Sequence, residues 1–114
     1  MSSRPEIEIC SFLDLVNVDY KHSDRTIIKP YELDIVLSSK KLAIEFNGSY
    51  WHSDEKILER TNGKMNAQEY HQMKIDMCKK KGYELLHIFE DDWIKHREKE
   101  LNKLYKFIGV NYYV

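Results

Sequence analysis

The chain has 114 residues and a mass of 13.7 kDa, the size of one ordinary domain with a single core. Hydrophobic residues make up 42% and charged residues 32% of it, which excludes an intrinsically disordered chain. No apolar run approaches the length of about 18 residues that a membrane span needs, and the polar N-terminus lacks the apolar stretch of a signal peptide.

Charge and cysteine content narrow the function further. A net charge of −1 argues against a dedicated basic nucleic-acid platform, but it allows an enzyme that touches a phosphodiester locally. Cys10 and Cys78 form neither a CxxC pair nor a disulfide framework. We therefore expect a cytoplasmic protein and, if there is a metal, oxygen or nitrogen ligands.

The first predicted element is a helix over about residues 4–17. Pro5 is tolerated in a first turn, where the helix dipole favours the carboxylate of Glu6. Its apolar residues recur at helical spacing: Ile9, Phe12, Leu13 and Val16.

Residues 24–46 change to the two-residue period of strands. Ile27 and Ile28 are β-branched, which favours a strand before the break at Pro30. Apolar residues alternate over 33–37, with Asp34 among them, and 42–46 is the returning strand of a predicted β-hairpin.

The second half predicts a loop, a helix, a strand and a final helix. Residues 53–65 are charged and polar and predict a mobile loop. A helix follows, from Asn66 or Ala67 to Lys81, and ends at Gly82. The largely apolar segment 83–89 predicts a buried central strand, and a last helix continues to about Ile108. The predicted buried stripe of that helix is Ile94, Leu101, Leu104, Tyr105 and Ile108.

This order, α-β-β-β-α-β-α, predicts an α/β fold with a mixed sheet flanked by helices. Within it, Asp34 and Glu45 lie on adjacent strands of the hairpin, away from its turn. Two carboxylates in a half-buried sheet repel each other and lose hydration, so they favour a bound cation such as Mg²⁺. The alternative is that Asp34 is a strand-edge carboxylate and Glu45 an exposed residue.

Three further side chains are candidates for the same site. His52 follows the end of the hairpin and is suited to acid or base chemistry, although a surface histidine is the simpler interpretation. His71 and Lys74 lie one turn apart on the apolar side of the second helix, which indicates either a phosphate site or a snorkelling edge. Lys79, Lys80 and Lys81 are expected to be a solvated helix end.

Together these motifs resemble the PD-(D/E)XK (restriction-endonuclease-like) nuclease superfamily. The matching segments are E-L-D-I-V-L (32–37), K-L-A-I-E-F-N-G-S-Y-W-H (41–52) and G-Y-E-L-L-H-I-F-E-D-D-W (82–93). More narrowly, the chain resembles very-short-patch-repair endonucleases and phage homing endonucleases with an EDxHD catalytic domain. The resemblance implies that residues 1–114 form a single nuclease catalytic domain, or a fragment of a longer protein with a separate DNA-binding region.

The resemblance also implies roles for individual residues. Glu6 matches the acid of the first helix, and Asp34 and Glu45 match the metal-binding pair, with the backbone carbonyl of Phe46 as a further ligand. His52 matches the general acid or base. Tyr50 and Trp51 match aromatic residues that wedge into the base stack, although here they can equally pack in the core.

Two departures from the family pattern stand out. Asn47 replaces the lysine of the E-x-K motif, and Lys74 is the candidate substitute. An aspartate of the repair family matches His71 here, and Asp54 and Asp76 are the other candidates for that acid. The expected DNA contacts are Arg25, Asn47, Tyr50, Trp51 and Lys74.

The sequence thus predicts a Mg²⁺-dependent endonuclease, with Mn²⁺ as a substitute, that acts on double-stranded DNA in a phage or bacterial setting. A homodimer or a linked DNA-binding domain would supply further affinity. The alternatives within the nucleases are a mismatch-repair or restriction-type enzyme and a junction resolvase. Outside them are a catalytically degenerate DNA-binding module and an interaction domain with no nucleic-acid role.

Overall fold

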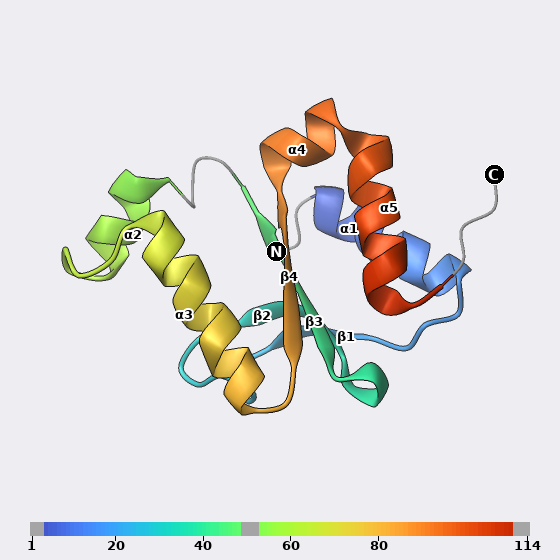
Figure 1. Cartoon of the computed structure of the whole chain (residues 1–114), viewed down its shortest axis with the longest axis horizontal. Coiled ribbons are helices and arrows are strands. Elements are labelled where there is room, and N and C mark those ends of the chain that lie inside the picture. The colour runs from blue at the N-terminus through green and yellow to red at the C-terminus, as the bar shows by residue number, and fades with distance from the viewer. Residues whose placement is uncertain (1–3, 49–52, 111–114) are drawn as a thin grey trace.

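A computed structural model describes residues 4–48 and 53–110 of the chain (Figure 1). A four-stranded sheet lies between helices, which confirms the predicted mixed α/β architecture. The elements are α1 (Arg4–Leu15), β1 (Lys21–Asp24), β2 (Leu33–Leu37), the 3₁₀ turn η1 (Ser38–Lys40), β3 (Leu42–Asn47), α2 (Asp54–Arg60), α3 (Ala67–Lys80), β4 (Glu84–Phe89), α4 (Glu90–Lys95) and α5 (Arg97–Ile108).

The strands follow the order β1-β2-β3-β4 across the sheet. The hairpin is confirmed, because β2 pairs antiparallel with β3, as β1 does with β2. A crossover through α2 and α3 then brings β4 parallel to β3, with Glu45 beside His87 and Asn47 beside Phe89. β4 is therefore an edge strand, and the prediction that 83–89 is central was wrong. Of its apolar side chains, Ile88 is buried, Leu85 and Leu86 are partly buried, and Phe89 is exposed.

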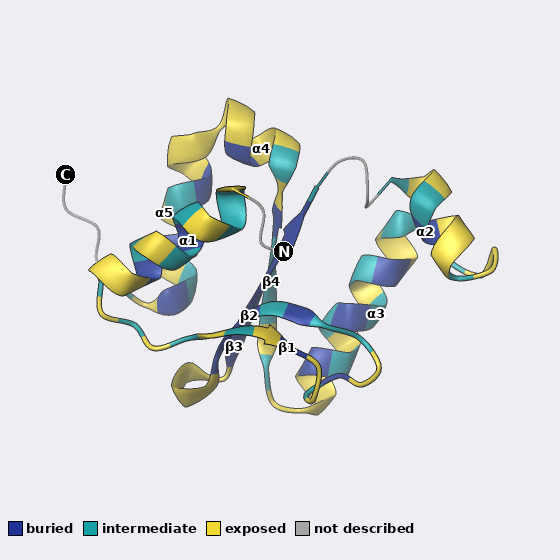
Figure 2. Ribbon diagram, turned by 180° about the vertical axis from the view of Figure 1, so that it is seen from behind, coloured by how far each residue is buried: buried dark blue, intermediate teal, exposed yellow. Residues whose placement is uncertain are grey.

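Each face of the sheet carries its own apolar core. α1 and α5 cover one face, where Ile35, Ile44 and Ile88 pack against helix residues such as Leu13 and Leu104. α3 covers the other face over a smaller core (Ile28, Leu33, Val36, Ala43 and Cys78). Every residue of β3 is buried (Figure 2). A polar side chain on β3 is consequently enclosed between the sheet and a helix.

Two predicted segments before and after the hairpin differ from the structure. The first strand is Lys21–Asp24, and not the β-branched pair that follows it. Ile28 instead packs from a turn into the α3-side core, and Asp24 stabilises that turn by accepting the backbone N–H groups of Thr26 and Ile27 at 3.0 and 2.9 Å. The predicted loop 53–65 contains α2, whose buried residue is Ile57. The element order is therefore α-β-β-β-α-α-β-α-α.

The last predicted helix is two helices that meet at His96. The break turns the buried face, so that Trp93 is 2% exposed while Ile94, predicted to be buried, is 66% exposed. Arg97 links the two helices to α1. Its guanidinium carbon lies 4.6 Å from the centroid of the Trp93 ring, and the guanidinium forms an ion pair with Glu8 of α1 at 2.9 Å. Among the described helices, none is long and apolar enough to cross a membrane.

Candidate active site

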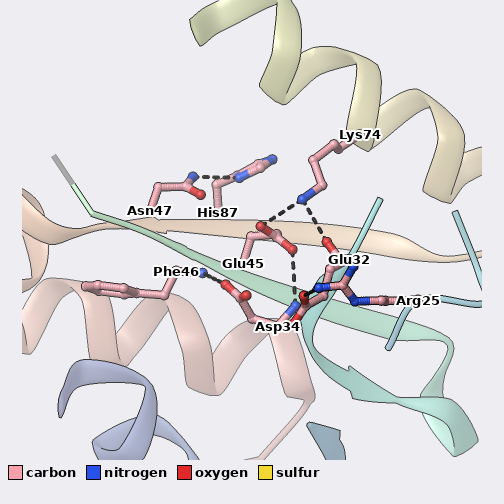
Figure 3. A network of polar contacts seen from close by, with 8 residues as sticks. All are labelled: Arg25, Glu32, Asp34, Glu45, Phe46, Asn47, Lys74 and His87. Carbon is pink, nitrogen blue, oxygen red and sulfur yellow. Dashed lines mark hydrogen bonds and ion pairs between the residues drawn. The ribbon is translucent and has the colours of Figure 1, made fainter. Parts of the chain in front are cut away.

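The site forms where β2 and β3 separate. Their pairing ends at Ile35 and Ile44, so Asp34 and Glu45 would be the next opposed pair. Instead of ladder bonds, each carboxylate accepts an amide of the other strand (Figure 3). Glu45 Oε1 accepts the Asp34 N–H at 3.1 Å, and Asp34 Oδ2 accepts the Phe46 N–H at 2.8 Å. This exchange fixes both carboxylates at the diverging strand ends.

Lys74 reaches this pair from α3. Its Nζ lies 3.1 Å from Glu45 Oε2 and donates to the backbone carbonyl of Glu32 at 2.8 Å (Figure 3). Lys74 is 5% exposed and Glu45 is 3% exposed, so the alternative of Glu45 as an exposed residue was wrong. The Glu32 side chain in turn binds Arg25 at 2.8 Å. The predicted lysine thus forms a buried ion pair with the predicted glutamate.

The electrostatics of the carboxylate pair are unfavourable without a further cation. Burial is the main reason that the pKa of Asp34 rises to about 6, and the charge of Glu6 adds to it. Burial followed by the charge of Asp34 raises the pKa of Glu45 to about 7, although Lys74 opposes this. One ammonium group therefore does not compensate two carboxylates, of which Glu45 is buried and Asp34 is partly buried.

α1 contributes a third carboxylate. Glu6 lies in the first turn of α1, and its charge acts on Asp34. Glu6 Oε2 is 3.4 Å from Nε2 of His22 on β1. His22 was not a candidate in the sequence analysis, because the segment K-H-S-D carries no apolar alternation that would have placed it in the sheet.

A polar pair continues the site along β3 and β4. Asn47 is 1% exposed, and its side-chain amide donates to Nδ1 of His87 at 2.8 Å. The ring of His71 lies 4.9 Å from that of His87 and 5.4 Å from that of Phe89, between ring centroids. Burial, followed by the charge of Lys74, lowers the pKa of His71. His87 was also missed, since it stands within an apolar run that predicted only a core strand.

The remaining candidates lie away from the pair or outside the described residues. Asp54 Oδ1 accepts the Ala67 N–H at 2.9 Å at the start of α3, and exposed Asp76 accepts Gln72 Nε2 at 3.0 Å. Neither contacts the carboxylate pair through these bonds. Tyr50, Trp51 and His52 fall outside the described residues, so their roles stay predictions.

The donor set fits a hard divalent cation. Over residues 4–48 and 53–110, no group of three or more His, Cys, Asp or Glu side chains is arranged to hold a metal. Mg²⁺ does not need one, because it keeps several waters and takes only one or two carboxylates. The carboxylates of Asp34 and Glu45 provide oxygen ligands of that kind, and the Phe46 carbonyl stays a predicted third ligand. Their raised pKa values show that additional positive charge would stabilise the ionised pair.

Comparison with solved structures finds one whose fold is similar to that of this chain. The chain is similar to a homing endonuclease catalytic domain. That structure, the catalytic domain of homing endonuclease I-Bth0305I, superposes with a TM-score of 0.63 and 28% sequence identity, over 93% of this chain and 94% of its own. Neither a protein-family model nor a curated protein matches the sequence. The similarity supports a nuclease fold for this chain and suggests nuclease function.

Proposed function

We propose that this domain is a metal-dependent DNA endonuclease of the PD-(D/E)XK type that hydrolyses phosphodiester bonds. The observation that carries the proposal is the Asp34–Glu45 pair, in which each carboxylate accepts a backbone N–H of the other strand and buried Glu45 also pairs with Lys74. Its occurrence in a fold similar to a homing endonuclease catalytic domain favours cleavage of DNA over other phosphodiesters.

Each residue has a defined task in this proposal. Asp34 and Glu45, with the Phe46 carbonyl, would hold Mg²⁺ or Mn²⁺, and Glu6 would support them from α1. Such an ion would supply Lewis-acid stabilisation of the phosphate charge and would make a water molecule easier to deprotonate. Lys74 orients Glu45 and adds positive charge near the scissile phosphate. Its position on α3 compensates for Asn47, which stands in place of the E-x-K lysine and is directed to His87. His52 handles the proton of the water or of the leaving group.

The test is cleavage of supercoiled plasmid with Mg²⁺ and with EDTA. We expect nicking or linearisation by the wild type with Mg²⁺, and a loss of at least about 100-fold, near 3 kcal/mol, in Asp34→Ala and His52→Ala. Asp19→Ala is the matched control, because this aspartate is exposed and lies outside the site. Equal cleavage by Asp34→Ala and the wild type would refute the assignment. Binding of DNA without any cleavage by the wild type would favour a degenerate DNA-binding module instead.

A further inference from the structure

A stripe of lysines follows the exposed side of α5. Lys99, Lys103 and Lys106 are spaced four and three residues apart, which places them on one face of the helix. Lys95, at the end of α4, continues the stripe across the helix junction. All four residues are exposed, and the junction is largely open on the surface (Figure 2). The net charge of −1 therefore conceals a local concentration of positive charge.

Most of this charge is not neutralised by neighbouring acids. Lys103 lies 3.3 Å from Glu100, but among the described residues none forms an ion pair with Lys95, Lys99 or Lys106. With Arg97, the four lysines line an open hollow of about 690 Å³ in which Glu98 is the acidic side chain. The concentration of positive charge around this hollow is complementary to a polyanion.

The hollow lies toward the end of the sheet at which β3 and β4 finish, and the candidate active site lies near the same end. β4 ends at Phe89, beside Asn47, and α4 starts at the next residue. Lys95 follows the first residue of α4 by five positions, and a helix rises about 1.5 Å per residue. Lys95 is therefore about 8 Å along the α4 axis from the end of β4. α5 then returns along the α1 face of the sheet (Figure 1). The stripe thus begins near the active-site edge and extends away from it.

We propose that this lysine stripe binds the sugar–phosphate backbone of duplex DNA beside the cleavage site. That the DNA is cleaved beside the stripe rests on the proposed function. From Lys99 to Lys106 the stripe is about 10 Å long, which matches about three phosphates of one DNA strand, spaced about 3.4 Å apart along the duplex axis. Two of the expected DNA contacts, Lys74 and Asn47, are buried, so an exposed basic surface is needed for contacts along the DNA backbone. Phosphate contacts of this kind fix position along the DNA without reading its sequence.

The test is a salt titration of binding to a fluorescent duplex of about 20 base pairs, in EDTA, over about 50 to 200 mM salt. The variant is Lys95→Gln, Lys99→Gln and Lys106→Gln combined. Its control combines Lys79→Gln, Lys80→Gln and Lys81→Gln, which removes the same number of charges. These lysines lie at the end of α3, just before β4 begins, and so at the opposite end of the sheet from the candidate site. Thermal unfolding of all three proteins verifies that these surface substitutions leave the fold intact.

We expect the stripe variant to bind at least about tenfold more weakly at low salt, with a slope of log K against log salt shallower by about 2.7, or about 0.9 for each of three lost contacts. The control should keep a slope near that of the wild type. Equal effects in both variants, or no binding by the wild type, would overturn the proposal. Plasmid cleavage distinguishes this proposal from the proposed function. If the stripe variant has a shallower slope but the wild type does not cleave, the DNA-binding surface is supported and the nuclease function is refuted. If the wild type cleaves but the slope of the stripe variant is unchanged, the nuclease function is supported and the DNA-binding surface is refuted.

Discussion

Asp34→Asn tests the strained electrostatics of the site by a change in stability. The asparagine side chain keeps an oxygen that can accept the Phe46 N–H, so the substitution removes charge and little else. Burial raises the pKa of Asp34 from 3.8 to about 6, and each unit between folded and unfolded pKa corresponds to about 1.4 kcal/mol. At about pH 8 without metal, the variant should therefore be more stable by about 2 to 3 kcal/mol.

The sign of the pH dependence follows from the direction of the shift. The folded state holds its proton at a pH where the unfolded state has already lost it, so wild-type stability falls as pH rises from about 4 to about 7. Below about pH 4 the advantage of the Asp34→Asn variant should disappear. At about pH 8, Mg²⁺ at 100 times its Kd should largely cancel the difference in stability, because it adds about 2.7 kcal/mol to the wild type and little to the variant.

Urea denaturation at several pH values, with EDTA and with Mg²⁺, measures these differences. Asp24→Asn is the control: burial opposes ionisation there too, but hydrogen bonds from Ile27 and Thr26 outweigh it and lower the pKa of Asp24 to about 2. That variant should lose stability at neutral pH, and the loss should fade in acid. An Asp34→Asn protein that is less stable than the wild type in EDTA at about pH 8, or a difference independent of pH, would refute the reasoning.

Three other substitutions test the surroundings. Lys74→Met should lower the free energy of unfolding by about 3 kcal/mol at about pH 8, because it leaves the charge of Glu45 buried and uncompensated. The loss should be smaller at about pH 5, where Glu45 is protonated. A loss in urea denaturation that does not depend on pH would contradict this. Asn47→Leu should cost about 1 to 2 kcal/mol and shift the ¹⁵N resonance of His87 Nδ1, which loses its donor; an unchanged resonance would argue against that hydrogen bond. Asn66→Ala should cost about 1 kcal/mol through loss of the α3 capping box, as thermal unfolding would show, whereas unchanged stability would mean that the cap contributes nothing.

The hairpin could be predicted because its residues alternate, and alternation also placed Asp34 and Glu45 side by side. α2 could not, because D-E-K-I-L-E-R is almost entirely charged and owes its burial to Ile57 alone. The break at His96 carries no proline or glycine, so local sequence gives no sign of it. Arg97 packs on Trp93 there and pairs with Glu8, which is 89 residues away in the chain, and this long-range contact is not visible in the local sequence.

The candidate site shows the same division. Lys74 could be proposed because its charge interrupts an apolar helix face. Its ion pair with Glu45 and its bond to the Glu32 carbonyl depend on how α3 crosses the sheet, which no local pattern encodes. His22 and His87 had no such signal, since a histidine inside a strand is equally compatible with either face. Sequence therefore indicated the acidic residues and left most of their polar partners to the tertiary structure.

The pairing of Glu45 with a lysine from a helix has an evolutionary consequence. Positions 45 and 74 lie far apart in sequence but touch in space, whereas position 47, which carries the lysine in the E-x-K pattern, is occupied by an amide. A second ammonium group in the same enclosed space would be repelled by the first. In related sequences, positions 47 and 74 should therefore change together, so that a lysine at position 47 is accompanied by a neutral residue at position 74. A sequence search that scores each alignment position independently would overlook such a paired substitution.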